Sequence, residues 1–137
     1  MTYVEFRERQ QREINDFPMA AAFSEKQLEE AMQKLNVQSP KELVHVAGGM
    51  LIRRDDQKDL LALLKRHDDE WKQAMKNDDL LQEAFIYEMG NHEYCLTMDR
   101  EDTLNALQIT DEEFLADIRL RGIFSKAEKE YLKSAGW

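Results

Sequence analysis

The middle of this sequence contains two histidines and a glutamate in predicted helices. Metal-binding proteins often use these side chains as ligands. Glu88 and His92 are four residues apart, a spacing that brings both side chains to one face of a helix, where they could hold one ion. His67 lies on the apolar face of the preceding helical segment. These residues predict a candidate metal site at His67, Glu88 and His92. The alternative, which the pattern favours, is a pair of buried histidines, each hydrogen-bonded to a carboxylate or a carbonyl.

Motifs that would define a reaction are missing. The chain has neither the Glu-x-x-His pairs of di-iron bundles nor the His-Glu-x-x-His helix of metalloproteases. It has no glycine-rich phosphate loop followed by lysine, and its single Cys excludes a disulfide framework. We therefore predict no catalytic residue and no cofactor. A metal-dependent enzyme at His67, Glu88 and His92 is the least favoured function.

The negative charge of the chain is concentrated in one block. The net charge is −9, but residues 78–117 hold twelve acids and one base, a net charge of −11. The remainder has 18 bases and 16 acids, so it is close to neutral. Nine of the acids are the predicted partner-binding residues: Asp78, Asp79, Glu83, Asp99, Glu101, Asp102, Asp111, Glu112 and Glu113.

This charge pattern narrows the class of partner. Phosphate binding needs clustered lysine and arginine, so direct binding of nucleic acid is not expected. An acidic block suits a basic protein surface or cations, or it simply keeps the chain in solution. The prediction is a basic protein partner, with a solvated acidic face as the alternative.

The elements that position these residues are predicted to be helices. Capping boxes, in which a Ser or Thr and a Glu or Gln three residues later satisfy the first turn of a helix, occur five times. They begin at Thr2, Ser24, Ser39, Thr110 and Ser125. The Ser39 box predicts a short helix over Pro40–Val46, while Gly122 predicts a helix end that separates the last two helices.

The longest apolar stripe runs over Leu60, Leu64, His67, Trp71 and Met75, and a second helix follows the break at residues 77–79. Two long helices with so short a joint should form an antiparallel hairpin. The fold class is therefore all-α: a compact bundle of about six to seven helices around this central hairpin. One short extended segment near residues 50–53 is the alternative to a buried connector there.

Length and composition favour one domain over residues 1–137, because 137 residues with 42% apolar side chains suffice for one core. No apolar run is long enough to cross a membrane, and the first residues do not resemble a signal peptide. The expected location is the cytoplasm, without membrane contact.

Several segments resemble those of an uncharacterised family of small proteins from gut Firmicutes and their phages or mobile elements. The similar segments are TYVEFRERQQREIN from Thr2 to Asn15, Phe17–Met19, Ala22–Gln27, Arg66-His67, Asn91–Tyr94 and Thr103–Thr110. The resemblance implies a setting in a mobile element, and no activity.

Three functions fit these observations. The first is a non-enzymatic protein that blocks a basic surface of a nucleic-acid-handling host enzyme, such as a nuclease, through residues 78–117, as acidic anti-CRISPR or anti-defence inhibitors do. The second is a structural or regulatory interaction module, such as a homodimer. The third is the metal-dependent enzyme already named.

Overall fold

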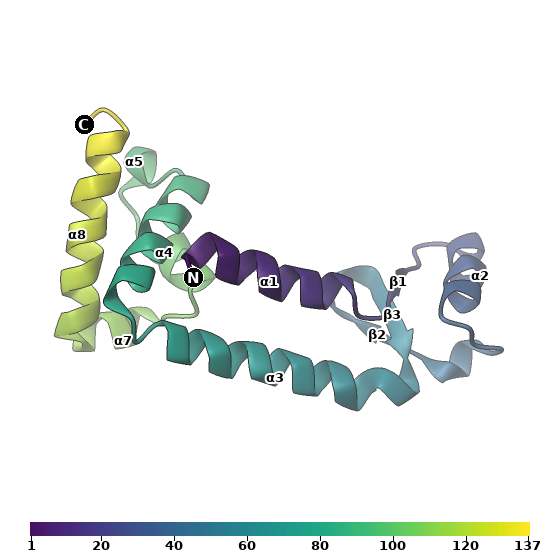
Figure 1. Ribbon diagram of the computed structural model, residues 1–137. Coiled ribbons are helices and arrows are strands. Elements are labelled where there is room, and N and C mark those ends of the chain that lie inside the picture. The colour runs from purple at the N-terminus through teal and green to yellow at the C-terminus, as the bar shows by residue number, and fades with distance from the viewer. The chain divides into compact units, whose positions relative to one another are not determined.

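A computed structural model describes all residues, 1–137, and contains eight α-helices and one small three-stranded sheet (Figure 1). The prediction of a mostly all-α fold is confirmed. The chain divides into two compact units. We call Met1–Arg7 with Trp71–Trp137 the helical unit, and Glu8–Glu70 the sheet unit. The single-domain expectation stays a prediction, because a compact unit need not fold independently.

Two helices contribute residues to both units: α1 (Tyr3–Asn15) and α3 (Gln57–Ala74). The other helices of the helical unit are α4 (Asp78–Asn91), α5 (Tyr94–Thr97), α6 (Glu101–Ala106), α7 (Asp111–Ala116) and α8 (Ile118–Ser134). Side chains that accept backbone N–H bonds begin three of these helices: Asn77 caps α4, Thr110 caps α7 and Asp117 caps α8.

The core of the helical unit forms mainly where α4 packs against α8 (Figure 1). Leu81, Ala84, Phe85 and Met89 of α4 are fully buried. The ring of Phe85 meets the ring of Phe124 from α8 edge to face, with 5.2 Å between their centroids. This geometry aligns the positive edge of one ring with the negative face of the other.

The sheet unit contains β1 (Ala20–Ala21), α2 (Glu25–Lys34), β2 (Leu43–Val46) and β3 (Met50–Arg53). The strand order is β1-β3-β2, and both pairs are antiparallel. The turn between β2 and β3 contains Gly48 and Gly49, whose φ angles of 77° and 73° are readily adopted only by glycine. A separate small core joins α2 to the sheet.

Sequence and structure differ at three places. The extended segment near residues 50–53 is confirmed as β3, but the helix predicted over Pro40–Val46 is wrong. Only Pro40–Glu42 form a 3₁₀ turn, and Leu43–Val46 pair with β3, where their β-branched valines fit a pleated surface. The break predicted at Gly122 is also wrong, since α8 is continuous through that residue.

The third difference is the central hairpin. Asn77 does begin a new helix after α3, as expected. However, the main packing partners of α4 are α8 and α6, so the pairing of two consecutive long helices does not organise the helical unit.

No helix in the structure is both long enough and apolar enough to cross a membrane.

Truncating the core of the helical unit should destabilise the protein strongly. Phe85→Ala removes a fully buried ring, and the lost burial together with the cavity should cost about 3–5 kcal/mol of unfolding free energy. Urea unfolding followed by circular dichroism measures this. Ile118→Ala is the control: its side chain is 80% exposed, so the change should stay within about 0.5 kcal/mol. Equal losses for both variants would contradict the assigned core.

Candidate functional site

The predicted partner-binding acids all lie at the surface of the helical unit. Each of the nine is exposed, and they belong to the first half of α4, to the start of α6 and its preceding turn, and to the first turn of α7. We call these nine residues the acidic surface. Charged side chains that have no buried partner normally lie at the protein surface. This exposure therefore shows only that the acids are accessible.

Five of the nine acids also hold local structure together. Asp78 pairs with Arg119 at 2.7 Å, and Asp111 pairs with Arg100 at 2.9 Å. Three acids accept backbone N–H bonds: Glu83 from Tyr3, Asp99 from Glu101, and Glu113 from Thr110. The remaining four, Asp79, Glu101, Asp102 and Glu112, make no side-chain hydrogen bond or ion pair within the chain. These four carboxylates are free to meet a partner.

The acids around α6 border a hollow in the surface. Met98, Asp99, Glu101 and Asp111 line it together with Arg100. The guanidinium of Arg100 lies 5.0 Å above the ring of Phe114, which holds it in place as a cation–π contact. The lining of the hollow thus combines carboxylates with apolar side chains and one cationic side chain.

Glu88 differs from the acidic surface because its side chain is only 4% exposed. The Tyr3 hydroxyl donates to it at 2.8 Å, and Arg7 and His92 approach it at 3.4 Å each. Burial, followed by the hydrogen bond to Glu88, raises the pKa of the Tyr3 phenol well above its usual value. The phenol therefore stays protonated and remains a donor to the buried carboxylate.

The three residues of the predicted metal site belong to two different units. Glu88 and His92 do come together in the helical unit, where Tyr3 and Arg7 also contact Glu88. His67 belongs to the sheet unit, where a nitrogen of its ring and one carboxylate oxygen each from Glu13 and Glu70 lie within 4.8 Å of one another. The structure places two carboxylates, Glu13 and Glu70, beside His67 within its own unit, whereas the sequence grouped it with Glu88 and His92.

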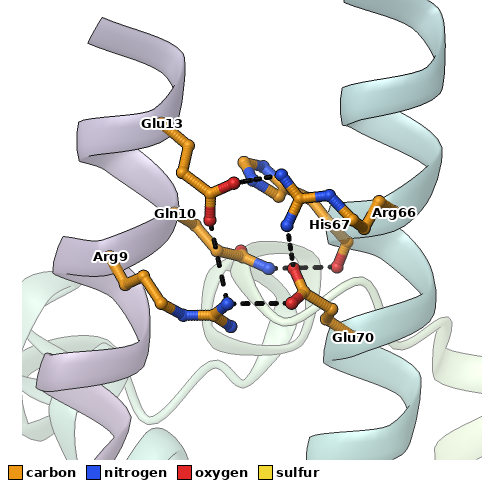
Figure 2. Close-up of polar contacts among 6 residues, drawn as sticks. All are labelled: Arg9, Gln10, Glu13, Arg66, His67 and Glu70. Carbon is orange, nitrogen blue, oxygen red and sulfur yellow. Dashed lines mark hydrogen bonds and ion pairs between the residues drawn. The ribbon is translucent and has the colours of Figure 1, made fainter. Parts of the chain in front are cut away.

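These neighbours form a polar cluster between α1 and α3, which lie side by side in the sheet unit (Figure 2). We call Arg9, Glu13, Arg66, His67 and Glu70 the α1–α3 cluster. Arg9 bridges both carboxylates, at 2.9 Å from Glu70 and 3.7 Å from Glu13. Arg66 does the same, with a close ion pair to Glu13 and a longer one to Glu70 at 3.4 Å.

Gln10 fixes the helices beside this cluster. Its amide donates to the backbone carbonyl of His67 at 3.1 Å (Figure 2). His67 is buried, and its Nε2 atom points toward Glu13 at 3.7 Å without a hydrogen-bond partner. A buried polar atom without a hydrogen-bond partner costs free energy, so this arrangement of the His67 ring is unfavourable.

The sequence carried a partial signal for this cluster. Arg9 and Glu13 are four residues apart, as are Arg66 and Glu70, a spacing that pairs charges on one helix. Nothing in the spacing indicates that the two pairs meet. The role of Glu13 was therefore missed, and the cluster depends on how α1 packs against α3.

The mostly helical fold and the acidic surface do not by themselves define a known class of protein. Residues 2–130 match a family of unknown function (DUF7659), and the chain belongs to that family. No curated protein and no solved structure matches the chain.

Removing Arg66 should change the titration of Glu13. The hydrogen bond from Arg66 holds the pKa of Glu13 below its usual value, so Arg66→Met should raise that pKa toward the usual value. The pair stabilises the fold above the usual pKa of the carboxyl group, and this contribution is lost as the pH falls through the lowered value. Side-chain carboxyl NMR measures the shift.

Lys65→Met provides the matched control for this titration. It removes one positive charge from the neighbouring position of α3, where the lysine pairs with Asp69 and not with Glu13. The pKa of Glu13 should stay unchanged in this variant. An equal shift in both variants would mean that net charge, and not the Arg66 contact, lowers the pKa.

Proposed function

We propose that the protein is a non-enzymatic binding protein whose acidic surface occupies a basic surface of a nucleic-acid-handling protein. The observation that carries the proposal is the set of four exposed carboxylates, Asp79, Glu101, Asp102 and Glu112, that have no partner within the chain. Their charge is left uncompensated at the surface. A basic groove built for phosphates offers the complementary charge.

An internal role for these acids does not account for the charge of the whole block. The four residues lie in the first turns of α4, α6 and α7, where a carboxylate stabilises the positive end of the helix dipole. One or two acids in a first turn suffice for this effect. Residues 78–117 carry a net charge of −11, and such a field raises the association rate of a basic partner.

Apolar side chains in the same unit add contact area. Leu96, Met98, Leu115 and Ile118 are between 50% and 80% exposed, and Met98 lines the hollow beside Asp99 and Glu101. Protein interfaces combine such apolar contacts with a charged rim. The exposed apolar residues also favour the alternative function, a homodimer. Two copies facing each other through the acidic surface would repel, which disfavours that surface as the dimer contact.

The proposed setting is a mobile element of a Firmicute, and the proposed target is a host nuclease or related enzyme. An inhibitor of this kind acts by covering the groove that would hold DNA or RNA. Its binding should therefore weaken with salt and should compete with nucleic acid.

Neutralising the four free acids should weaken partner binding. The variant combines Asp79→Asn, Glu101→Gln, Asp102→Asn and Glu112→Gln. Four rim charges of this type are together worth on the order of tenfold in affinity. The immobilised wild-type chain is used to capture a binding protein from a Firmicute lysate at low salt. The affinity of the purified binding protein is then compared between wild type and variant.

The control variant neutralises four exposed acids of the sheet unit: Glu25→Gln, Glu29→Gln, Glu30→Gln and Asp59→Asn. It changes the net charge by the same amount and should keep wild-type affinity. Double-stranded DNA should displace the partner from the wild-type chain. Equal weakening by both variants, or binding that DNA and salt leave unchanged, would contradict the proposal.

A further inference from the structure

We propose that Glu13, His67 and Glu70 of the sheet unit bind one divalent transition-metal ion of the Zn²⁺ type. One ligand atom from each side chain, the ring nitrogen of His67 and a carboxylate oxygen of each glutamate, lies within 4.8 Å of the other two. The ligands come from two helices that pack within one unit, Glu13 from α1 and the other two from α3. The site is distinct from the acidic surface and does not depend on the function proposed for it.

His67 supplies the second, independent observation. The residue is only 9% exposed, and its Nε2 atom has no hydrogen-bond partner although it points into the cluster. A buried imidazole nitrogen normally donates to or accepts from a neighbour, because an unpaired buried polar atom costs free energy. A metal ion bonded to Nε2 would satisfy this atom, and neutral imidazole is a common ligand of such ions.

The spacing needs little adjustment to hold an ion. In a tetrahedral site with bonds of about 2.1 Å, neighbouring ligand atoms are about 3.4 Å apart. Nε2 of His67 and Oε2 of Glu13 are already 3.7 Å apart. The carboxylate of Glu70 completes three protein ligands, which leaves one position for water, as in open zinc sites.

The type of ligand decides the type of ion. Calcium and magnesium prefer sites made only of oxygen atoms, with six or more ligands in the case of calcium. One imidazole and two carboxylates suit Zn²⁺, Co²⁺ or Mn²⁺. We therefore expect Zn²⁺ to bind in the presence of a large excess of Mg²⁺.

Arg66 competes with the ion for both carboxylates. It contacts Glu13 and Glu70, yet its side chain is 48% exposed, so it can rotate into solvent without crossing the core. An ion that takes its place replaces a single positive charge with two. Arg9 contacts the same carboxylates from the other helix. Metal binding is therefore an exchange of Arg66 for the ion, and removing Arg66 should favour the ion.

The three histidines of the chain give a matched set of variants for the test. Isothermal titration of the full chain with Zn²⁺, in excess Mg²⁺, should give one saturable site, and Co²⁺ should give the visible absorption of a low-symmetry site. His67→Gln should weaken Zn²⁺ binding at least tenfold. His45→Gln and His92→Gln should leave it unchanged. Circular dichroism after chelation checks that each variant is folded.

Arg66→Met keeps the test independent of any folding defect at His67. It should tighten Zn²⁺ binding several-fold, because the cation that competes for both carboxylates is gone. Absence of a saturable site in the wild type would overturn the proposal. Equal losses in the three histidine variants, or weaker binding by Arg66→Met, would also overturn it.

Discussion

The helical unit depends on the burial of one carboxylate. Glu88 lies on the inner side of α4, and a charge without water must be hydrogen-bonded to be tolerated. Tyr3 and Arg7 of α1 supply those partners, together with His92. The first residues of the chain are thereby bound to a helix more than 80 residues away in sequence. Removing one partner would leave the buried carboxylate with too few hydrogen bonds. This loss would destabilise the fold by more than an exposed ion pair stabilises it.

The same principle explains where the other acids lie. Glu88, one carboxylate of the acidic block, can be buried because α1 supplies a hydrogen-bond donor and a positive charge to it. The nine acids of the acidic surface remain in contact with solvent. The bases that could balance them are few: Arg100 and Arg119 each hold one aspartate. In the sheet unit, the charges of two arginines and two glutamates balance one another between α1 and α3. The helical unit therefore exposes most of its acids, while the α1–α3 cluster of the sheet unit pairs its charges internally.

Local patterns predicted the helices well and their packing poorly. Ser24 and Thr110 cap the helices that their boxes indicated, because a cap depends on residues within one turn. The helix predicted over Leu43–Val46 is wrong because these residues pair with β3. That pairing depends on the turn between the strands, which residue spacing within the segment does not reveal. Ser125 looked like a cap, but it lies inside α8, where the buried face from Leu120 to Tyr131 keeps the helix continuous. His67 was identified as a candidate ligand, but its partners come from α1, and only tertiary packing brings Glu13 to it.

The carboxylates without internal partners are proposed to form the contact with a basic protein. Carbodiimide labelling of carboxylates, read by mass spectrometry in the free chain and in complex with the captured partner, tests this directly. We expect Asp79, Glu101, Asp102 and Glu112 to become protected in the complex, while Glu25, Glu29 and Glu30 keep their labelling rates. Unchanged labelling of the first group, or protection of the second, would contradict it.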